Sequence, residues 1–195
     1  QVVEVGAQVQ HLSVGTRASI SPSRPCGHCE YCQQGKHNHC LNMRFYGSAM
    51  RNPHVQGAFR QELVVDAHQA HVLADHVSDQ EGAMVEPLAV ALHAVGRAGS
   101  VMGKQVLVTG CGPIGALVVV VARRSGAREI VVTDVGDFTL GKAMQVGADQ
   151  AINVASHPEA LDAFKADKGH FDVLFESSGN PQALRSGLDV LKPRG

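Results

Sequence analysis

Four of the five cysteines in this 195-residue chain lie close together in the sequence. Cys26, Cys29, Cys32 and Cys40 are separated by two, two and seven residues. Cysteine thiolates are preferred zinc ligands, and four of them complete a tetrahedron that leaves no open position for a substrate. The spacing therefore predicts a structural Zn²⁺ site, and it places any chemical step elsewhere.

Disulfides, free thiols and an iron–sulfur cluster are the alternatives to zinc for these cysteines. Cysteines three residues apart pair poorly with one another, and the rest of the chain has the character of a cytosolic protein. An iron–sulfur cluster also takes four thiolates, but the last gap is too long for a ferredoxin pattern and no second cysteine group follows. His28, His37 and His39 lie in the same loop and could replace a ligand. With four thiols present, solvated histidines and bound zinc are the favoured interpretation.

A glycine-rich turn is the second motif that could carry chemistry. Residues 110–115 form the pattern G-x-G-x-x-G between an apolar run at 105–109 and a predicted helix at 112–125. In a dinucleotide fingerprint the first glycine permits the turn, the second lets the backbone approach the pyrophosphate, and the third permits close helix–strand packing. Free N–H groups at the helix N-terminus would then face the phosphates. The expected cofactor-binding residues of this turn are Gly110, Gly112, Pro113, Ile114 and Gly115.

Asp134 ends the next predicted strand, nineteen residues after Gly115. A carboxylate at this place can accept hydrogen bonds from both ribose hydroxyls. It would repel a 2′-phosphate, and no Arg or Lys follows before Lys142. The sequence therefore favours NAD over NADP. The alternative is a glycine turn in a doubly wound domain that binds no nucleotide.

The elements that would position the glycine turn alternate regularly along the C-terminal half. The predicted strands are 105–109, 129–134, 150–154 and 171–176, and the predicted helices are 112–125, 138–146, 158–165 and 181–191. Strands that alternate with helices require right-handed crossovers and a parallel sheet. The hydrophobic share of 44%, carried mainly by valine and alanine, fits such a buried sheet.

The N-terminal half has a different texture. Short β-type runs lead into a cysteine lobe at about 22–46, and 57–65 is predicted as a further strand. Ser78 and Glu81 form a capping-box pattern at the start of a helix. Pro87 is expected either to kink that helix or to restart it.

Two domains are expected from this change of texture. The first, residues 1–85, is β-rich and carries the cysteine lobe, and the second, residues 86–195, is an α/β domain with a partial doubly wound parallel sheet. Gln1 is not a start methionine, and the chain stops at a turn, Lys192 to Gly195, that normally leads into another strand. Both domains are therefore expected to be incomplete, and the chain to be a fragment.

Composition argues against several classes of partner. The formal net charge is −1, so no broad basic surface is available for nucleic acid or a membrane. The apolar stretch 106–122 is interrupted by three glycines and a proline and is short for a bilayer span. No signal peptide is visible. We expect a cytoplasmic protein with no nucleic-acid or membrane partner.

The order of these motifs resembles that of the zinc-containing medium-chain alcohol and polyol dehydrogenases. The resemblance covers essentially the whole chain and is carried by the cysteine lobe, Gly57-Ala58-Phe59, Glu86-Pro87-Leu88-Ala89-Val90, the turn 110–115, and Phe175-Glu176 with Gly179. It implies an incomplete GroES-like domain followed by an incomplete Rossmann domain. The segments 22–29 and 43–50 resemble most closely the branch that oxidises sugar acids of the idonate type.

The resemblance also implies a reaction and further site residues. Such an enzyme transfers hydride between a secondary hydroxyl of a sugar acid or polyol and NAD(P), with a catalytic Zn²⁺ in the full-length parent. Glu86 is the candidate catalytic residue and zinc ligand within this chain; the alternative is a carboxylate favoured by its place near a helix N-terminus. The family's other catalytic-zinc ligands precede these residues. The family likeness implies a homo-oligomeric parent and an inactive fragment that binds one zinc.

Three interpretations remain open beside the sugar-acid enzyme. The parent could be a sorbitol- or threonine-type dehydrogenase of the same family, or the chain could be a zinc-stabilised binding module without catalysis.

A sugar-acid carboxylate would need a cationic partner, for which Arg44 and Arg51 are candidates. Ordinary surface arginines are the simpler interpretation of these two residues.

Overall fold

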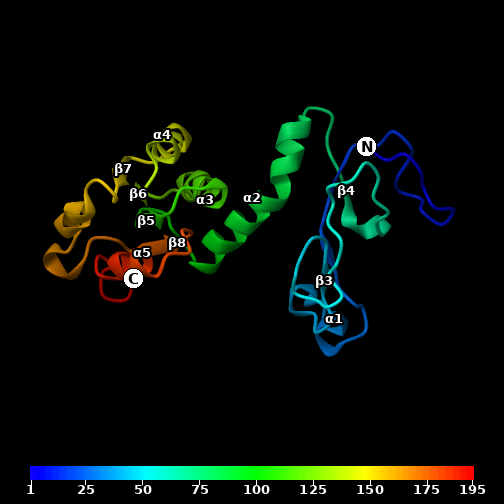
Figure 1. The fold of residues 1–195 in the computed structure, drawn as a ribbon, viewed down its shortest axis with the longest axis horizontal. Helices are drawn as coiled ribbons and strands as arrows, with labels where there is room; N and C mark the ends of the chain where they lie inside the picture. The colour runs from blue at the N-terminus through cyan, green and yellow to red at the C-terminus, as the bar shows by residue number, and fades with distance from the viewer. The chain divides into compact units, whose positions relative to one another are not determined.

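The computed structural model describes residues 1–195 and divides them into two compact units, residues 1–86 and 87–195 (Figure 1). The N-terminal unit contains two small antiparallel sheets. One pairs β1 (Ala18–Ile20) with β4 (Ala70–Val72), and the other pairs β2 (Ser23–Arg24) with β3 (Arg44–Phe45). Single turns of helix lie between these strands, at α1 (Glu30–Gln33), η1 (His37–His39) and η2 (Ala67–Gln69).

Gln69 holds the two small sheets of this unit together. Its side chain is buried, and its amide donates hydrogen bonds to the carbonyls of Ser21, at 2.8 Å, and Ser23, at 3.1 Å. Its side-chain oxygen accepts from the backbone N–H of Asp66 at 3.1 Å. A buried amide is tolerated only when its donors and acceptor are paired, and here all are used to join neighbouring segments.

The prediction of a strand at 57–65 is wrong. This segment forms no strand, and the side chains of Phe59 and Val64 are exposed. The apolar alternation in the sequence suggested a half-buried strand, but a strand also needs a partner edge, and no pairing reaches this segment.

Helix α2 (Asp79–Arg97) begins at the predicted capping box. The backbone N–H of Ser78 donates to Glu81 Oε2 at 2.8 Å, and the N–H of Glu81 donates to Ser78 Oγ at 3.2 Å. These reciprocal bonds satisfy two donors at the helix start. The backbone N–H and the hydroxyl of Ser78, which both donate to the Glu81 carboxylate, lower its pKa. Pro87 lies inside the helix, which continues past it to Arg97.

The C-terminal unit is built on a four-stranded parallel sheet. Its strands lie in the order β7 (Gln150–Asn153), β6 (Glu129–Asp134), β5 (Gln105–Thr109) and β8 (Val173–Glu176). The intervening helices are α3 (Pro113–Arg124), α4 (Asp137–Val146) and α5 (Pro181–Leu188), with short turns of helix at η3 (Pro158–Phe164) and η4 (Ala166–Lys168). The predicted parallel α/β arrangement is confirmed.

The element predicted as a helix at 158–165 is a 3₁₀ helix instead. Leu161 and Phe164 are three residues apart, and both pack on the core cluster around Phe171. A 3₁₀ helix has three residues per turn, so it places this pair on one side, whereas the sequence pattern alone did not separate the two helix types.

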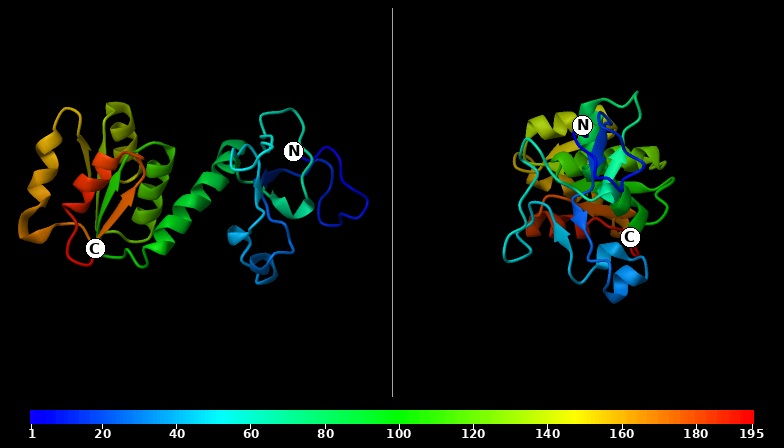
Figure 2. Two further views of the ribbon diagram at one scale, coloured as in Figure 1. Left: turned by 60° about the horizontal axis from the view of Figure 1, so that its bottom comes forward. Right: turned by 90° about the vertical axis from the view of Figure 1, so that its right-hand side faces the viewer.

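The strands bury side chains on both faces of the sheet. Val106 and Val108 pack in one cluster with residues of α2, α3 and α4. Leu107, which points to the opposite face, packs in the other cluster with Phe171 and Val190. Figure 2 shows the helices that cover these two faces. None of the helices combines the length and the apolar character that a bilayer crossing requires.

A polar network lies at the end of the sheet where the central strand β5 begins. The backbone N–H of Gln105 donates to Asp172 Oδ2 at 2.8 Å, and Lys192 Nζ donates to Asp172 Oδ1 at 2.8 Å. Partial burial alone would raise the pKa of Asp172, but the Gln105 amide and Lys192 outweigh it and lower that pKa. His170 Nε2 lies 2.8 Å from Glu129 Oε2 in the same network.

The lowered pKa of Asp172 predicts acid sensitivity of the C-terminal unit. The ionised carboxylate stabilises the fold at every pH above its unfolded pKa of about 4, and this contribution is lost as the pH falls through the lower folded-state pKa. We expect Asp172→Asn to lower the urea midpoint at neutral pH and to flatten its decline in acid. Asp189→Asn, at an exposed residue whose side chain accepts no hydrogen bond, is the control. Equal acid dependence of the Asp172 variant and the unsubstituted chain would contradict this assignment.

Candidate metal and nucleotide sites

The four clustered cysteines converge on one point in the structure. Their sulfur atoms all lie within 4.8 Å of one another, and Cys26 Sγ and Cys32 Sγ are 4.0 Å apart. Sulfurs at the corners of a Zn²⁺ tetrahedron with bonds of about 2.3 Å are separated by about 3.8 Å. All five cysteines of the chain are free thiols, so the disulfide alternative is not formed here. The separations of the sulfurs are close to those around a single Zn²⁺ ion, and the four thiols fit the predicted zinc site.

Short local elements bring these sulfurs together. Cys29 immediately precedes α1, Cys32 lies within it, and Cys40 follows η1. Backbone N–H groups point at the sulfur of Cys40, from Cys26 at 3.2 Å and from Asn42 at 3.4 Å. Such N–H donors stabilise thiolates and orient them for a metal.

The histidines of the lobe are not part of the converging group. The only set of metal-ligating side chains that meet in the structure consists of the four cysteines. His28 Nδ1 instead lies 2.8 Å from the carbonyl oxygen of Cys26, and the side chains of His37 and His39 are exposed.

The pKa values of three thiols are shifted in different directions. Backbone N–H groups of Cys32 and Leu41 lower the pKa of Cys29 to about 6. Burial raises the pKa of Cys32 to about 12. The backbone N–H of His28 lowers the pKa of Cys26. Because a metal binds thiolates, zinc must displace a proton from Cys32 in particular, and protons compete with zinc increasingly as the pH falls.

The glycine turn lies at the point where the strand order reverses. From β5 the chain passes to β6 and β7 on one side, and it then returns to β8 on the other side. The crevice at such a reversal, beyond the carboxyl ends of the strands, is where open α/β sheets bind ligands. Ser177 follows β8 and donates from Oγ to the carbonyl of Gly110 at 2.7 Å, so the two loops that flank the crevice are joined.

The three glycines of the turn differ in what surrounds them. Gly110 has a φ of +82°, and a Cβ there would lie 2.6 Å from the Cα of Ser178. A Cβ on Gly115 would lie 2.0 Å from the carbonyl oxygen of Gly110. A Cβ on Gly112 would meet no atom within 4 Å. Two glycines are therefore required by packing, whereas Gly112 faces open space at the N-terminus of α3, which fits room for a pyrophosphate.

Asp134 is anchored to the glycine turn, which the sequence did not predict. Its Oδ2 accepts from the N–H of Cys111 at 2.6 Å, and its Oδ1 accepts from Val135 at 2.7 Å and Gly136 at 3.0 Å. Burial opposes its charge, but these three donors outweigh burial and lower the pKa of Asp134. A carboxylate has about four acceptor positions, so about one remains for a ribose hydroxyl. The pattern Asp-x-Gly after a strand is a signal for the part of this bonding within the turn.

Asp134→Asn should therefore loosen the fold without any nucleotide present. The Asn side chain has an NH₂ group in place of one acceptor oxygen. In one orientation the NH₂ group faces the N–H of Cys111, and in the other it faces the N–H groups of Val135 and Gly136, so at least one hydrogen bond is lost. The expected loss is about 1–3 kcal/mol of unfolding free energy in urea denaturation. Asp189→Asn, at an exposed residue whose side chain accepts no hydrogen bond, should alter that free energy by less than about 0.5 kcal/mol. If the two variants were equally stable, Asp134 would have no anchoring role.

Glu86 stands apart from any other ligand. It lies exposed on α2, and no group of converging Cys, His, Asp or Glu side chains includes it. No interaction of its carboxylate with another side chain competes for it, so the structure leaves Glu86 available but assembles no second metal site around it.

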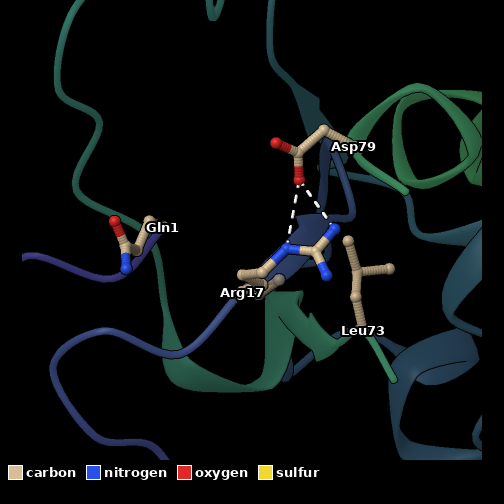
Figure 3. Close-up of a pocket in the computed structure, with 5 residues that line it drawn as sticks. Gln1, Arg17, Leu73 and Asp79 are labelled. Carbon is tan, nitrogen blue, oxygen red and sulfur yellow. Dashed lines mark hydrogen bonds and ion pairs between the residues drawn. The ribbon is translucent and has the colours of Figure 1, made fainter. Parts of the chain in front are cut away.

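A cavity of about 240 Å³ in the N-terminal unit contains none of the predicted site residues. Figure 3 shows Arg17 and Asp79 in its wall, with Arg17 Nη2 2.7 Å and Nε 3.1 Å from Asp79 Oδ1. Arg17 also donates to the carbonyl of Val77 at 2.6 Å. Its charge is thus used to tie the segment before β1 to the start of α2.

Two family models match the chain. The alcohol dehydrogenase GroES-like domain matches residues 1–75, and the zinc-binding dehydrogenase domain matches residues 113–195.

Named relatives show the same likeness. The chain is 42% identical to the L-idonate 5-dehydrogenase (NAD(P)(+)) of Escherichia coli strain K12 over 184 residues, which are 94% of the chain and 53% of that enzyme. The crystal structure of L-idonate 5-dehydrogenase from that species superposes with a TM-score of 0.90 at 41% identity, covering 97% of the chain and 54% of the enzyme. The sorbitol dehydrogenase of Bacillus subtilis strain 168 is 34% identical, covering 100% of the chain and 54% of that enzyme.

A solved structure with bound cofactor is also similar. The crystal structure of a zinc-binding dehydrogenase from Sinorhizobium meliloti bound to NADP has a TM-score of 0.89 and 30% identity, covering 100% of the chain and 56% of that protein. The chain spans about half the length of the curated relatives it matches.

Proposed function

Since the chain belongs to the zinc-binding medium-chain dehydrogenases, we propose that the complete protein oxidises a secondary hydroxyl of a sugar acid with NAD(P), as an L-idonate 5-dehydrogenase does. The observation that carries this choice of substrate is the difference in identity, 42% to L-idonate 5-dehydrogenase against 34% to sorbitol dehydrogenase. A polyol of the sorbitol type is the second candidate, because that relative matches the whole chain.

The dinucleotide would lie across the switch point between β5 and β8. Open space at Gly112 and the free N–H groups at the start of α3 support phosphate binding there. Asp134 would accept a ribose hydroxyl at its remaining position. Bound nicotinamide would supply the hydride acceptor, and a catalytic zinc would polarise the hydroxyl. The role of the chain's own residues is to hold and orient the cofactor.

NAD is proposed over NADP as the preferred cofactor. Backbone N–H groups lower the pKa of Asp134, so its carboxylate keeps its charge to a lower pH than usual. At neutral pH that charge would repel a 2′-phosphate. Val135 and Phe138, which follow it, are exposed and uncharged. Lys142 lies over the ring of Phe138, 5.6 Å from its centroid. One relative acts with NAD(P) and another was solved with NADP, so the preference is expected to be a ratio and not an exclusion.

Two zinc sites are proposed, with different roles. The four cysteines would hold the structural ion. Glu86 would lie at or next to the catalytic ion, whose remaining ligands would come from outside residues 1–195. The chain alone is then expected to bind one zinc and to transfer no hydride. We also propose that the complete protein is a cytoplasmic homo-oligomer, which sedimentation and cell fractionation would test.

The test is turnover by the complete gene product that contains these residues. NADH formation would be followed on L-idonate, sorbitol and L-threonine, with NAD and NADP compared on each. We expect the highest kcat/KM on L-idonate with NAD. No turnover of L-idonate by protein with both zinc sites filled would overturn the substrate assignment, and preferred turnover of sorbitol would favour the second candidate.

A further inference from the structure

We propose that Arg51 is a positioning residue of the cysteine metal site: it holds the loop 41–43 so that the N–H of Asn42 faces the sulfur of Cys40. This inference rests on the structural zinc proposed above. It also gives Arg51 a different role from the one considered on sequence grounds, that of a partner for a substrate carboxylate.

The side chain of Arg51 donates hydrogen bonds to two carbonyl groups of the loop. Nε donates to the carbonyl of Met43 at 3.0 Å, and Nη2 donates to the carbonyl of Leu41 at 2.7 Å. Both bonds come from one planar guanidinium, so they fix the separation and the tilt of two carbonyls at once. The bond to Met43 is partly buried, and the bond to Leu41 is exposed.

The opposite side of the same loop faces the metal site. The N–H of Asn42 donates to Cys40 Sγ at 3.4 Å. The sulfur of Cys40 is therefore stabilised from this loop, although the loop contributes no ligand of its own.

One peptide unit connects the guanidinium to the sulfur. The carbonyl of Leu41 and the N–H of Asn42 belong to the same peptide, which is planar, and in a trans peptide they point in opposite directions. Arg51 holds the oxygen at one end while Cys40 Sγ accepts from the hydrogen at the other. A hydrogen bond to the carbonyl also polarises the peptide and strengthens its N–H as a donor.

The charge of a zinc site explains why a cation and N–H donors next to it would stabilise bound metal. Four thiolates around one Zn²⁺ leave a net negative charge, which N–H donors and a nearby cation relieve. Outer-shell partners of this kind orient the ligands, and their removal typically weakens metal binding by about 10–100-fold. Arg44, by contrast, is exposed and its side chain makes no hydrogen bond, so it remains the candidate for a substrate carboxylate.

The experiment measures zinc transfer from the whole chain to a chromophoric chelator at fixed neutral pH. Arg51→Gln is expected to weaken zinc binding about 10–100-fold relative to the unsubstituted chain. Arg51→Lys keeps the charge but lacks the fork, and it should fall between the two. The matched control is Arg60→Gln, at an exposed arginine whose side chain makes no hydrogen bond, and it should match the unsubstituted chain.

The outcomes separate this inference from the proposal it rests on. If the unsubstituted chain binds zinc and Arg51→Gln binds it equally well, the positioning role is overturned while the zinc site stands. If the unsubstituted chain binds no zinc, both fall together. Should Arg51→Gln fail to fold, Arg51→Lys decides, because unchanged zinc binding in that variant would overturn the role.

Discussion

Replacing Cys40 by serine should abolish zinc binding and unfold the lobe of residues 22–46, while the parallel sheet stays folded. Within 22–46 only Cys32 and Cys40 are buried, so the lobe has almost no apolar core of its own. Its strands are two residues long. In small zinc domains, binding of the metal supplies about 10–16 kcal/mol of folding free energy. Without a fourth ligand, little else holds this lobe.

Metal analysis and limited proteolysis check this expectation. Cys40→Ser should contain less than about a tenth of the zinc of the unsubstituted chain, because it lacks a ligand. It should also be cut within the lobe. Cys111→Ser is the matched control, because Cys111 is the fifth cysteine and is buried in the C-terminal unit. It should keep its zinc. A Cys40→Ser chain with full zinc content and an intact lobe would show that the cysteines do not act as one site.

Two alanine substitutions in the glycine turn should affect different properties, one the stability of the fold and the other nucleotide binding. At Gly115 a Cβ would lie 2.0 Å from the carbonyl oxygen of Gly110, and backbone cannot move aside as a flexible side chain can. Gly115→Ala should therefore lose about 3 kcal/mol of unfolding free energy, or more. At Gly112 the new methyl enters open space, so stability should change by less than about 1 kcal/mol. The same methyl would occupy the space proposed for the pyrophosphate.

Urea unfolding and nucleotide titration of the complete protein distinguish the two roles. Gly112→Ala should keep its unfolding midpoint and lose at least about tenfold in NADH affinity, equal to about 1.4 kcal/mol. Gly141→Ala, in α4 with no atom within 4 Å of the new carbon, is the control and should change neither binding nor folding for the worse. Unchanged NADH affinity in Gly112→Ala would remove the pyrophosphate from this turn.

The sequence predicted the C-terminal unit well because its signals are local. Strands such as Val106 to Thr109 are uninterrupted apolar runs, they are bounded by glycines, and each is followed by a helix. Parallel pairing then follows from the alternation alone. The four cysteines were equally readable, because the spacing of ligands around an ion depends on a few adjacent residues.

Contacts between distant residues were not predictable in this way. The segment 57–65 alternates like a strand, but nothing in its own letters reveals whether a partner edge exists. Arg51 reaches back eight and ten residues to two carbonyls, and a backbone acceptor leaves no mark in the sequence. Asp134 was expected to face a ribose, and its bond to Cys111 depends on how the two loops meet.

The most direct test of the account is X-ray absorption spectroscopy at the zinc edge, together with metal analysis, on the purified chain. We expect one zinc per chain, coordinated by four sulfurs at about 2.3 Å with no nitrogen or oxygen ligand. That result would establish the four cysteines as a closed structural site. A mixed shell with histidine nitrogen, or a chain without stoichiometric zinc, would contradict the account.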